Sequence, residues 1–185
     1  MDSRKKKNLI INCVAGIGIV SILIVFLLFN KEHYFHRYHD DHYNFSIKYP
    51  ASWTLEKNKN GAAVIFYSPQ EGDLDIFKES VNIVVQDIAG NPMNIKKYSK
   101  IAIEQMEAVF GDNMLTLESD PMYFAGHEGY KFVFRGKTPE TDLQYMSIWT
   151  IAGLNAYQVT YTALASQYDR HLPNVNKMIR SFRLH

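Results

Sequence analysis

The sequence predicts an α+β protein with a single transmembrane helix, followed by one domain in which amphipathic helices pack on an antiparallel β-sheet. Three observations predict this class. Residues 8–30 contain no charged side chain, several later segments alternate between apolar and polar residues as strands do, and two others have helical apolar spacing. The single cysteine, Cys13, lies in the uncharged segment, so the domain is predicted to contain no internal disulfide and to depend on its core for stability.

The uncharged segment 8–30 is expected to be a membrane anchor, with a lipid bilayer as its partner. As a helix it would be about 35 Å long, enough to cross the hydrocarbon core of a bilayer with some tilt. Cations fill positions 4–7 before it, and few follow it closely. The positive-inside rule therefore places the tail at 1–7 in the cytoplasm. The domain is expected to be periplasmic or otherwise extracytoplasmic, or luminal in an internal membrane.

Two alternatives to a retained anchor are less consistent with the residues. A cleaved signal peptide has a shorter apolar core and small residues at its exit, whereas this segment ends at Phe29 and Asn30. Lipoprotein processing would need Cys13, but most of the apolar residues follow that position, and small residues do not precede it. A signal anchor is therefore the favoured interpretation.

Residues 31–42 are expected to form a histidine-rich juxtamembrane stalk. Their aromatic residues beside Lys and Arg are typical of a membrane interface. If the helix continued through the stalk, histidines three residues apart would lie on adjoining turns, close enough to share one zinc or copper ion. The alternative is a solvated stalk without metal. The candidate metal ligands are His33, His36, His39 and His42.

The extracytoplasmic domain is expected to span residues 43–185 and to begin with strands. Residues 43–49 alternate strictly, Pro50 ends that strand, and the sequence from Asn58 to Gly61 is a hairpin signal. The next segment is apolar on both faces, which predicts a strand inside a covered sheet. The acidic loop at 69–79 is expected to be solvated, although clustered oxygen ligands also suit calcium. The further strands expected are 53–55, 62–68 and 80–87.

The hydrophobic period becomes helical between residues 94 and 110. Gly111 is placed to end this helix, which is expected to lie on the sheet. Strands are then expected at 114–118, 123–124, 130–137, 143–152 and 156–163. A second helix closes the domain, with Pro173 predicted at its first position. The buried stripes expected for the two helices are Ile95, Tyr98, Ala102, Met106 and Val109, then Val175, Met178, Ile179 and Phe182.

The domain resembles the PsbP family in three places. They are Ile47–Pro50 followed by Trp53, the turn at Gly126 and Gly129–Tyr130, and the ending. The matching residues of the ending are 157–162, Tyr168, Asp169, Pro173 and Ile179–Phe182. PsbP itself is an extrinsic subunit that supports the manganese–calcium cluster of photosystem II, and relatives occur in bacteria without a photosystem. The resemblance implies an antiparallel sheet with helices on both sides. It carries no metal ligand onto this chain.

The composition and the missing motifs argue against two classes of function. From residue 43 onward 14 Lys and Arg residues face 15 Asp and Glu residues, a near-neutral balance without the basic footprint of a nucleic-acid-binding protein. The sequence has no nucleophile motif and no phosphate-binding loop, and His127 and His171 are expected to be isolated surface residues. The chain is therefore not expected to be an enzyme or to need a cofactor.

The function that the sequence favours is that of a non-catalytic, membrane-anchored accessory or assembly subunit. It would dock its PsbP-like domain on an integral membrane protein complex. The alternative is a metal-binding or metal-delivery protein that uses the stalk histidines. An extracytoplasmic hydrolase is a third hypothesis, with no motif in its favour.

Overall fold

The computed structural model describes residues 34–70, 72, 77–138 and 141–185. The predicted tail at 1–7, the predicted span at 8–30 and His33 lie outside the described residues. Within the described part, neither helix combines the length and the apolarity that crossing a bilayer requires.

Within the described residues, ten strands form two antiparallel sheets. The larger sheet has the order β3-β4-β5-β9-β8-β7-β6, and the smaller one has the order β1-β2-β10. The strands of the larger sheet are β3 Thr54–Lys59, β4 Ala62–Tyr67, β5 Ser80–Asp87, β6 Met114–Phe124, β7 His127–Lys137, β8 Asp142–Ala152 and β9 Asn155–Leu164. Those of the smaller sheet are β1 Phe35–Asp40, β2 Phe45–Pro50 and β10 Arg183–Leu184. The antiparallel sheets and two helices confirm the predicted α+β class.

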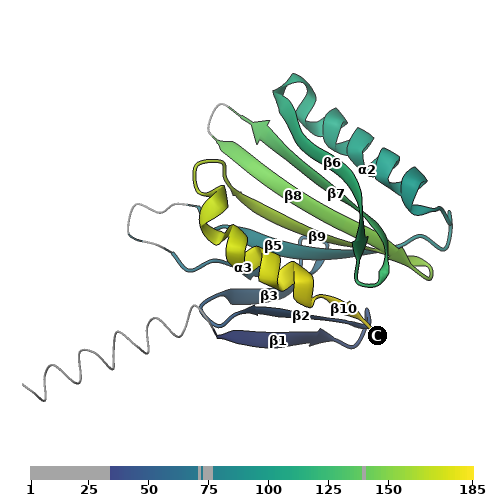
Figure 1. Ribbon diagram of the computed structural model, residues 1–185, viewed down its shortest axis with the longest axis horizontal. Coiled ribbons are helices and arrows are strands. Elements are labelled where there is room, and N and C mark those ends of the chain that lie inside the picture. The colour runs from purple at the N-terminus through teal and green to yellow at the C-terminus, as the bar shows by residue number, and fades with distance from the viewer. Residues whose placement is uncertain (1–33, 71, 73–76, 139–140) are drawn as a thin grey trace, which may run out of the picture.

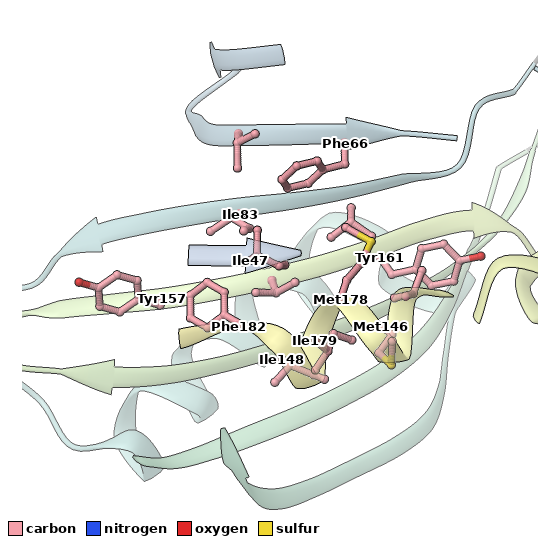
Figure 2. Close-up of a cluster of buried hydrophobic side chains, with 14 of the residues drawn as sticks. Ile47, Phe66, Ile83, Met146, Ile148, Tyr157, Tyr161, Met178, Ile179 and Phe182 are labelled. Carbon is pink, nitrogen blue, oxygen red and sulfur yellow. The ribbon is translucent and has the colours of Figure 1, made fainter. Parts of the chain in front are cut away.

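The two helices, α2 (Ile95–Phe110) and α3 (Tyr168–Ser181), cover opposite faces of the larger sheet (Figure 1). Alternation along each strand produces this division. In β7, Phe132 and Phe134 pack in the cluster under α2, whereas Val133 packs in the cluster that includes α3. The smaller sheet lies beside α3 and supplies Ile47 to the same core, where Figure 2 shows it near Met178 and Phe182.

The strand β1 corrects the predicted domain boundary. Residues 35–40 are not a helical stalk but a strand that pairs antiparallel with β2, from Phe35 opposite Pro50 to Asp40 opposite Phe45. Tyr38, which was expected at the membrane interface, is 6% exposed and packs on Phe66. Burial of this ring and the main-chain hydrogen bonds to β2 explain why residues 35–40 form a strand and not a continuation of a helix. The domain therefore begins by residue 34, not at residue 43.

Three other elements differ in detail from the predictions. Two expected strands are one continuous β6, in which Pro121 is tolerated because β6 is an edge strand. Helix α3 begins at Tyr168, so Pro173 lies inside it and not at its first position. Val109 is 78% exposed, since the ring of Phe110 packs instead into the space that Gly136 leaves open.

Candidate functional site

A groove runs between α2 and the hairpin formed by β6 and β7. Its volume is about 630 Å³, within the usual range for binding pockets. The lining is mostly apolar, with three charged side chains among its residues. These residues are Ile95, Lys96, Ser99, Lys100, Ile103, Pro121, Met122, Tyr123, Glu128, Gly129 and Tyr130. We call this the α2 groove.

The N-terminal half of α2 forms one wall of the α2 groove. Asn94 caps the helix by accepting a hydrogen bond from the backbone N–H of Lys97, at 2.9 Å. Ser99 accepts a hydrogen bond from Nε1 of Trp149 at 2.8 Å and donates one to the carbonyl of Ile95 at 2.7 Å. These bonds fix α2 on β8 and occupy the only hydroxyl among the helix residues that line the groove.

The opposite wall depends on the absence of a side chain at position 129. A Cβ atom there would lie 2.7 Å from the carbonyl oxygen of Trp149 and 3.1 Å from Cβ of Phe124, so a larger residue would push the strands apart. Next to it, the ring of Tyr130 stacks on Trp149 with centroids 5.6 Å apart. On this side the groove is therefore lined by a tyrosine that packs on a buried tryptophan.

The rim of the α2 groove has the composition of a protein interface. Tyr123 is 77% exposed and stands beside Pro121 and Met122 at the edge strand. Lys96, Lys100 and Glu128 supply charge around the apolar centre. Aromatic anchors inside a polar rim are typical of protein-binding hot spots. Among the described residues that line this groove, none is a histidine or a cysteine.

Sequence reasoning missed most of this groove. It identified Ile95 in the helical stripe and Gly129–Tyr130 in a turn, but it did not bring them together. The available signal was Ile103, an apolar residue beside the stripe of α2, together with the apolar sequence from Pro121 to Phe124. That these two segments face each other follows from the long connection that carries the chain from β5 to the far edge of the sheet.

The structure does not arrange the described histidines of residues 31–42 as a helix would. His36 lies in β1 near the ring of Tyr49, with centroids 5.8 Å apart, while His42 follows the strand and packs on Tyr43 at 4.4 Å. In a strand, positions 36 and 39 point to opposite faces of the sheet, so they do not converge. The expected neighbour relation of His36 and His39 on adjoining helical turns is therefore wrong.

His39 instead has a neighbour from the other end of the chain. Its ring centroid lies 5.2 Å from that of His185, and its Nε2 lies 3.0 Å from a carboxylate oxygen of Asp41. The Oγ of Ser46 and Nε2 of His185 are 2.9 Å apart. Even so, no three His, Cys, Asp or Glu side chains within the described ranges are grouped so that they could hold a metal ion.

A buried polar cluster corrects two predictions of surface exposure. His171 and Glu79 are only 8% and 3% exposed, although both were expected to be solvated; His127 is exposed, as predicted. The Nε2 of His171 lies 3.6 Å from Oε2 of Glu79, which also accepts a hydrogen bond from Ser68 at 3.0 Å. Trp53 packs edge-on against the imidazole. Glu71, Asp73 and Asp75 of the acidic loop lie outside the described residues.

The fold is shared with proteins of several sources. A solution structure of cyanobacterial PsbP (CyanoP) from Synechocystis sp. PCC 6803 aligns with a TM-score of 0.62 and 13% identity, over 82% of this chain and 92% of that chain. LpqN, involved in cell envelope biogenesis of Mycobacterium tuberculosis, aligns with a TM-score of 0.59 and 9% identity, over 82% and 90%. The Saccharomyces cerevisiae Ran-binding protein Mog1p gives 0.57 and 9%, over 82% and 95%.

The TM-scores show that these proteins share a fold with this chain. At 9–13% identity the likeness does not extend to their activities. No curated protein sequence matches the chain significantly. The PsbP family profile, in contrast, matches residues 33–184, which is nearly the whole of the described domain and includes β1. The chain therefore belongs to the PsbP family.

Proposed function

We propose that this protein is a non-catalytic accessory or assembly subunit, anchored in the membrane by residues 8–30, that docks its PsbP domain on an integral membrane protein complex. The α2 groove is the observation that carries the proposal. It offers a mostly apolar lining, an exposed aromatic residue at Tyr123 and three charged side chains. A partner helix or loop that covered Tyr123 would remove exposed apolar surface from water, which favours association.

The chemistry of the α2 groove favours binding over catalysis. Its one serine, Ser99, already donates to the carbonyl of Ile95 and accepts from Trp149. The charged rim residue Lys100 lies 3.7 Å from Glu104, an exposed pair on the helix surface. A catalytic site would need a nucleophile with a base within hydrogen-bond reach.

Site-specific photocrosslinking in native membranes tests this function. A photoreactive residue at Tyr123 of the full chain is expected to give one discrete adduct with a membrane protein, and Ile103→Lys is expected to abolish that adduct by placing a charge in the groove. The matched control is Leu115, which is 58% exposed and lies at the opposite end of β6. Equal adducts from both positions, or none from Tyr123, would contradict docking at the α2 groove.

Metal binding by the histidines of residues 31–42 is a second proposal, and the observation that favours it is the pair of His39 and His185, whose ring centroids lie 5.2 Å apart. Calorimetric titration of zinc and copper into the detergent-solubilised chain tests it, beside a variant with His33, His36, His39 and His42 changed to Gln. We expect weak binding at most, and it should weaken further on acidification because protons compete for imidazole. A variant with His185→Gln tests the pair of His39 and His185 separately. Loss of binding in this variant would assign the metal to that pair, and unchanged binding would assign it to the four predicted ligands.

A further inference from the structure

A second groove, formed by β1, β2, β10 and the C-terminal half of α3, is lined almost entirely by cations. Its volume is about 440 Å³. The lining residues are Phe35, Arg37, Lys48, Lys177, Arg180, Ser181 and Arg183. Five of these seven side chains are positively charged, although residues 43–185 as a whole have nearly balanced charge. We call this the cationic groove.

The fold forces these like charges together. Arg37 and Lys48 are direct cross-strand partners in β1 and β2, an arrangement that destabilises a sheet when both side chains carry the same charge. Lys177 and Arg180 are three residues apart and share one face of α3. The backbone N–H of Lys48 donates to Oγ of Ser181 at 2.8 Å, which fixes the end of α3 against β2. The like charges of β1, β2 and α3 are therefore held close together by the backbone of these elements.

Only part of this charge has a structural explanation. Arg183 donates to the carbonyl oxygens of Arg180 and Phe182, at 2.8 and 2.7 Å, and so satisfies acceptors at the end of α3. Lys177 lies over the ring of Phe35, 5.6 Å from its centroid. Within the described residues, none of the five cations forms a salt bridge with a carboxylate. Arg37, Lys48 and Arg180 are left exposed, and their clustering points to an anionic ligand.

We propose that the cationic groove binds the phosphate headgroups of anionic lipids in the membrane that holds the chain. The inference rests on the proposed anchor at 8–30. Only five peptide units separate Asn30 from Phe35, so a fully extended chain spans about 17 Å between them. Phe35 itself lines the groove. The tether therefore keeps one wall of the groove within reach of the headgroup layer, where clustered Lys and Arg residues bind anionic lipid.

Lipid binding at this groove would orient the domain. The cationic groove is lined partly by α3 and the α2 groove partly by α2. These two helices cover opposite faces of the larger sheet (Figure 1). A domain held at the membrane through α3 and β1 would thus leave Tyr123 free for a partner. A free acidic polypeptide is the competing ligand. It would have to reach the groove by diffusion, whereas the proposed anchor holds the groove close to the lipid headgroups.

Hydrogen exchange of the full chain in nanodiscs tests the inference. Discs of phosphatidylcholine alone are compared with discs that also contain phosphatidylglycerol. We expect anionic lipid to slow exchange in β2 and in the last turn of α3 by about tenfold, with the effect lost at high salt. The test variant carries Arg37→Gln, Lys48→Gln, Lys177→Gln and Arg180→Gln. The control variant loses four exposed cations elsewhere, through Lys59→Gln, Lys78→Gln, Lys97→Gln and Lys137→Gln.

The outcomes separate the anchor from the groove. Slower exchange that persists in the control variant and disappears in the test variant supports lipid binding, since the cations at 4–7 are the same in both. A chain that stays in the discs but exchanges equally in both lipids overturns the groove inference and leaves the anchor intact. Release from both kinds of disc overturns the anchor and the inference together. Protection by added poly-glutamate, but not by anionic lipid, would assign the groove to an acidic polypeptide and also overturn it.

Discussion

At the residue scale, Phe182 joins several layers of the core. It has no exposed surface, and its ring stacks against Phe45 and Phe124 with centroids 5.4 and 5.0 Å apart. Tyr157 contacts it edge-on at 6.4 Å. One side chain from the end of α3 thus contacts β2, β6 and β9, as the sequence pattern predicted when it placed Phe182 on the buried stripe.

Replacing Phe182 by Ala should lower the free energy of unfolding by about 3–5 kcal/mol, since a large aromatic core site is emptied. Trp53→Ala is expected to fall in the same range, because Trp53 is 4% exposed. Urea unfolding measures both, with the exposed Leu115→Ala as the control. A loss below about 1 kcal/mol at position 53 or 182 would contradict the core assignment.

The buried pair of Glu79 and His171 should be energetically coupled. Nε2 of His171 lies 3.6 Å from Oε2 of Glu79 and both residues are almost wholly buried, so removing one partner takes a polar neighbour from the other where water does not replace it. We expect Glu79→Gln and His171→Leu each to destabilise the fold, and the double variant to lose less than the sum by at least about 0.5 kcal/mol. Strict additivity in urea unfolding would show that the two side chains act independently.

Tyr168 should make the fold sensitive to alkaline pH. Burial raises the pKa of its hydroxyl to about 12; Glu118 and Asp169 add to the increase, and a hydrogen bond with Gln144 opposes it. The unfolded value is about 10, so the folded chain holds this proton more tightly. Its stabilising contribution is complete below pH about 10 and is lost as the pH rises toward 12. Tyr168→Phe should flatten the dependence of unfolding free energy on pH in this window, and an unchanged slope would refute the assignment.

At the element scale, the features predicted correctly are those that depend on caps, turns and hydrophobic periodicity within a few residues. Strand β5 has the predicted bounds, and α2 runs from Ile95 to Phe110, between its caps Asn94 and Gly111. The hairpin signal at Asn60–Gly61 forms a turn in which both residues have positive φ. Strand β1, whose conformation depends on partners outside its own segment, was not predicted.

Strand β1 shows why the rest escaped prediction. Its residues were assigned to a stalk through which the membrane helix could continue, whereas its strand conformation depends on β2 and on the core site filled by Tyr38. Burial of His171 likewise depends on Glu79 and Trp53, which come from other elements. The α2 groove could be predicted only in part for the same reason, because its two walls are far apart in the sequence.

Strand β1 should therefore belong to the stable folding unit. A domain of residues 34–185 is expected to unfold in one cooperative transition in the presence of chelator and reductant. A domain of residues 43–185, which lacks Tyr38 and the β1–β2 hydrogen bonds, should be less stable by at least about 2–4 kcal/mol, the usual effect of losing a large buried side chain. Thermal and urea unfolding compare the two. Equal stability would restore the boundary at residue 43.

At the scale of the whole molecule, topology is the first test of the proposed function. The cations at 4–7 predict a cytoplasmic N-terminus, with the domain on the other side of the membrane. In spheroplasts, added protease should remove a tag attached after His185 and spare a tag before Met1. The reverse pattern would overturn the proposed orientation and would place both grooves in the cytoplasm.

The smaller sheet sets an order of events during biogenesis. Its strands β1 and β2 come from residues 35–50, but β10, which pairs with Ser46 and Phe45, comes from residues 183–184. Helix α3, which packs on β2, also comes late in the chain. A nascent domain emerges N-terminus first. Strands β1 and β2 therefore cannot be joined by β10 in the smaller sheet until residue 184 has left the ribosome. If the domain is exported as it is made, most of it would cross the membrane before the smaller sheet could form, and so before the domain is fully folded.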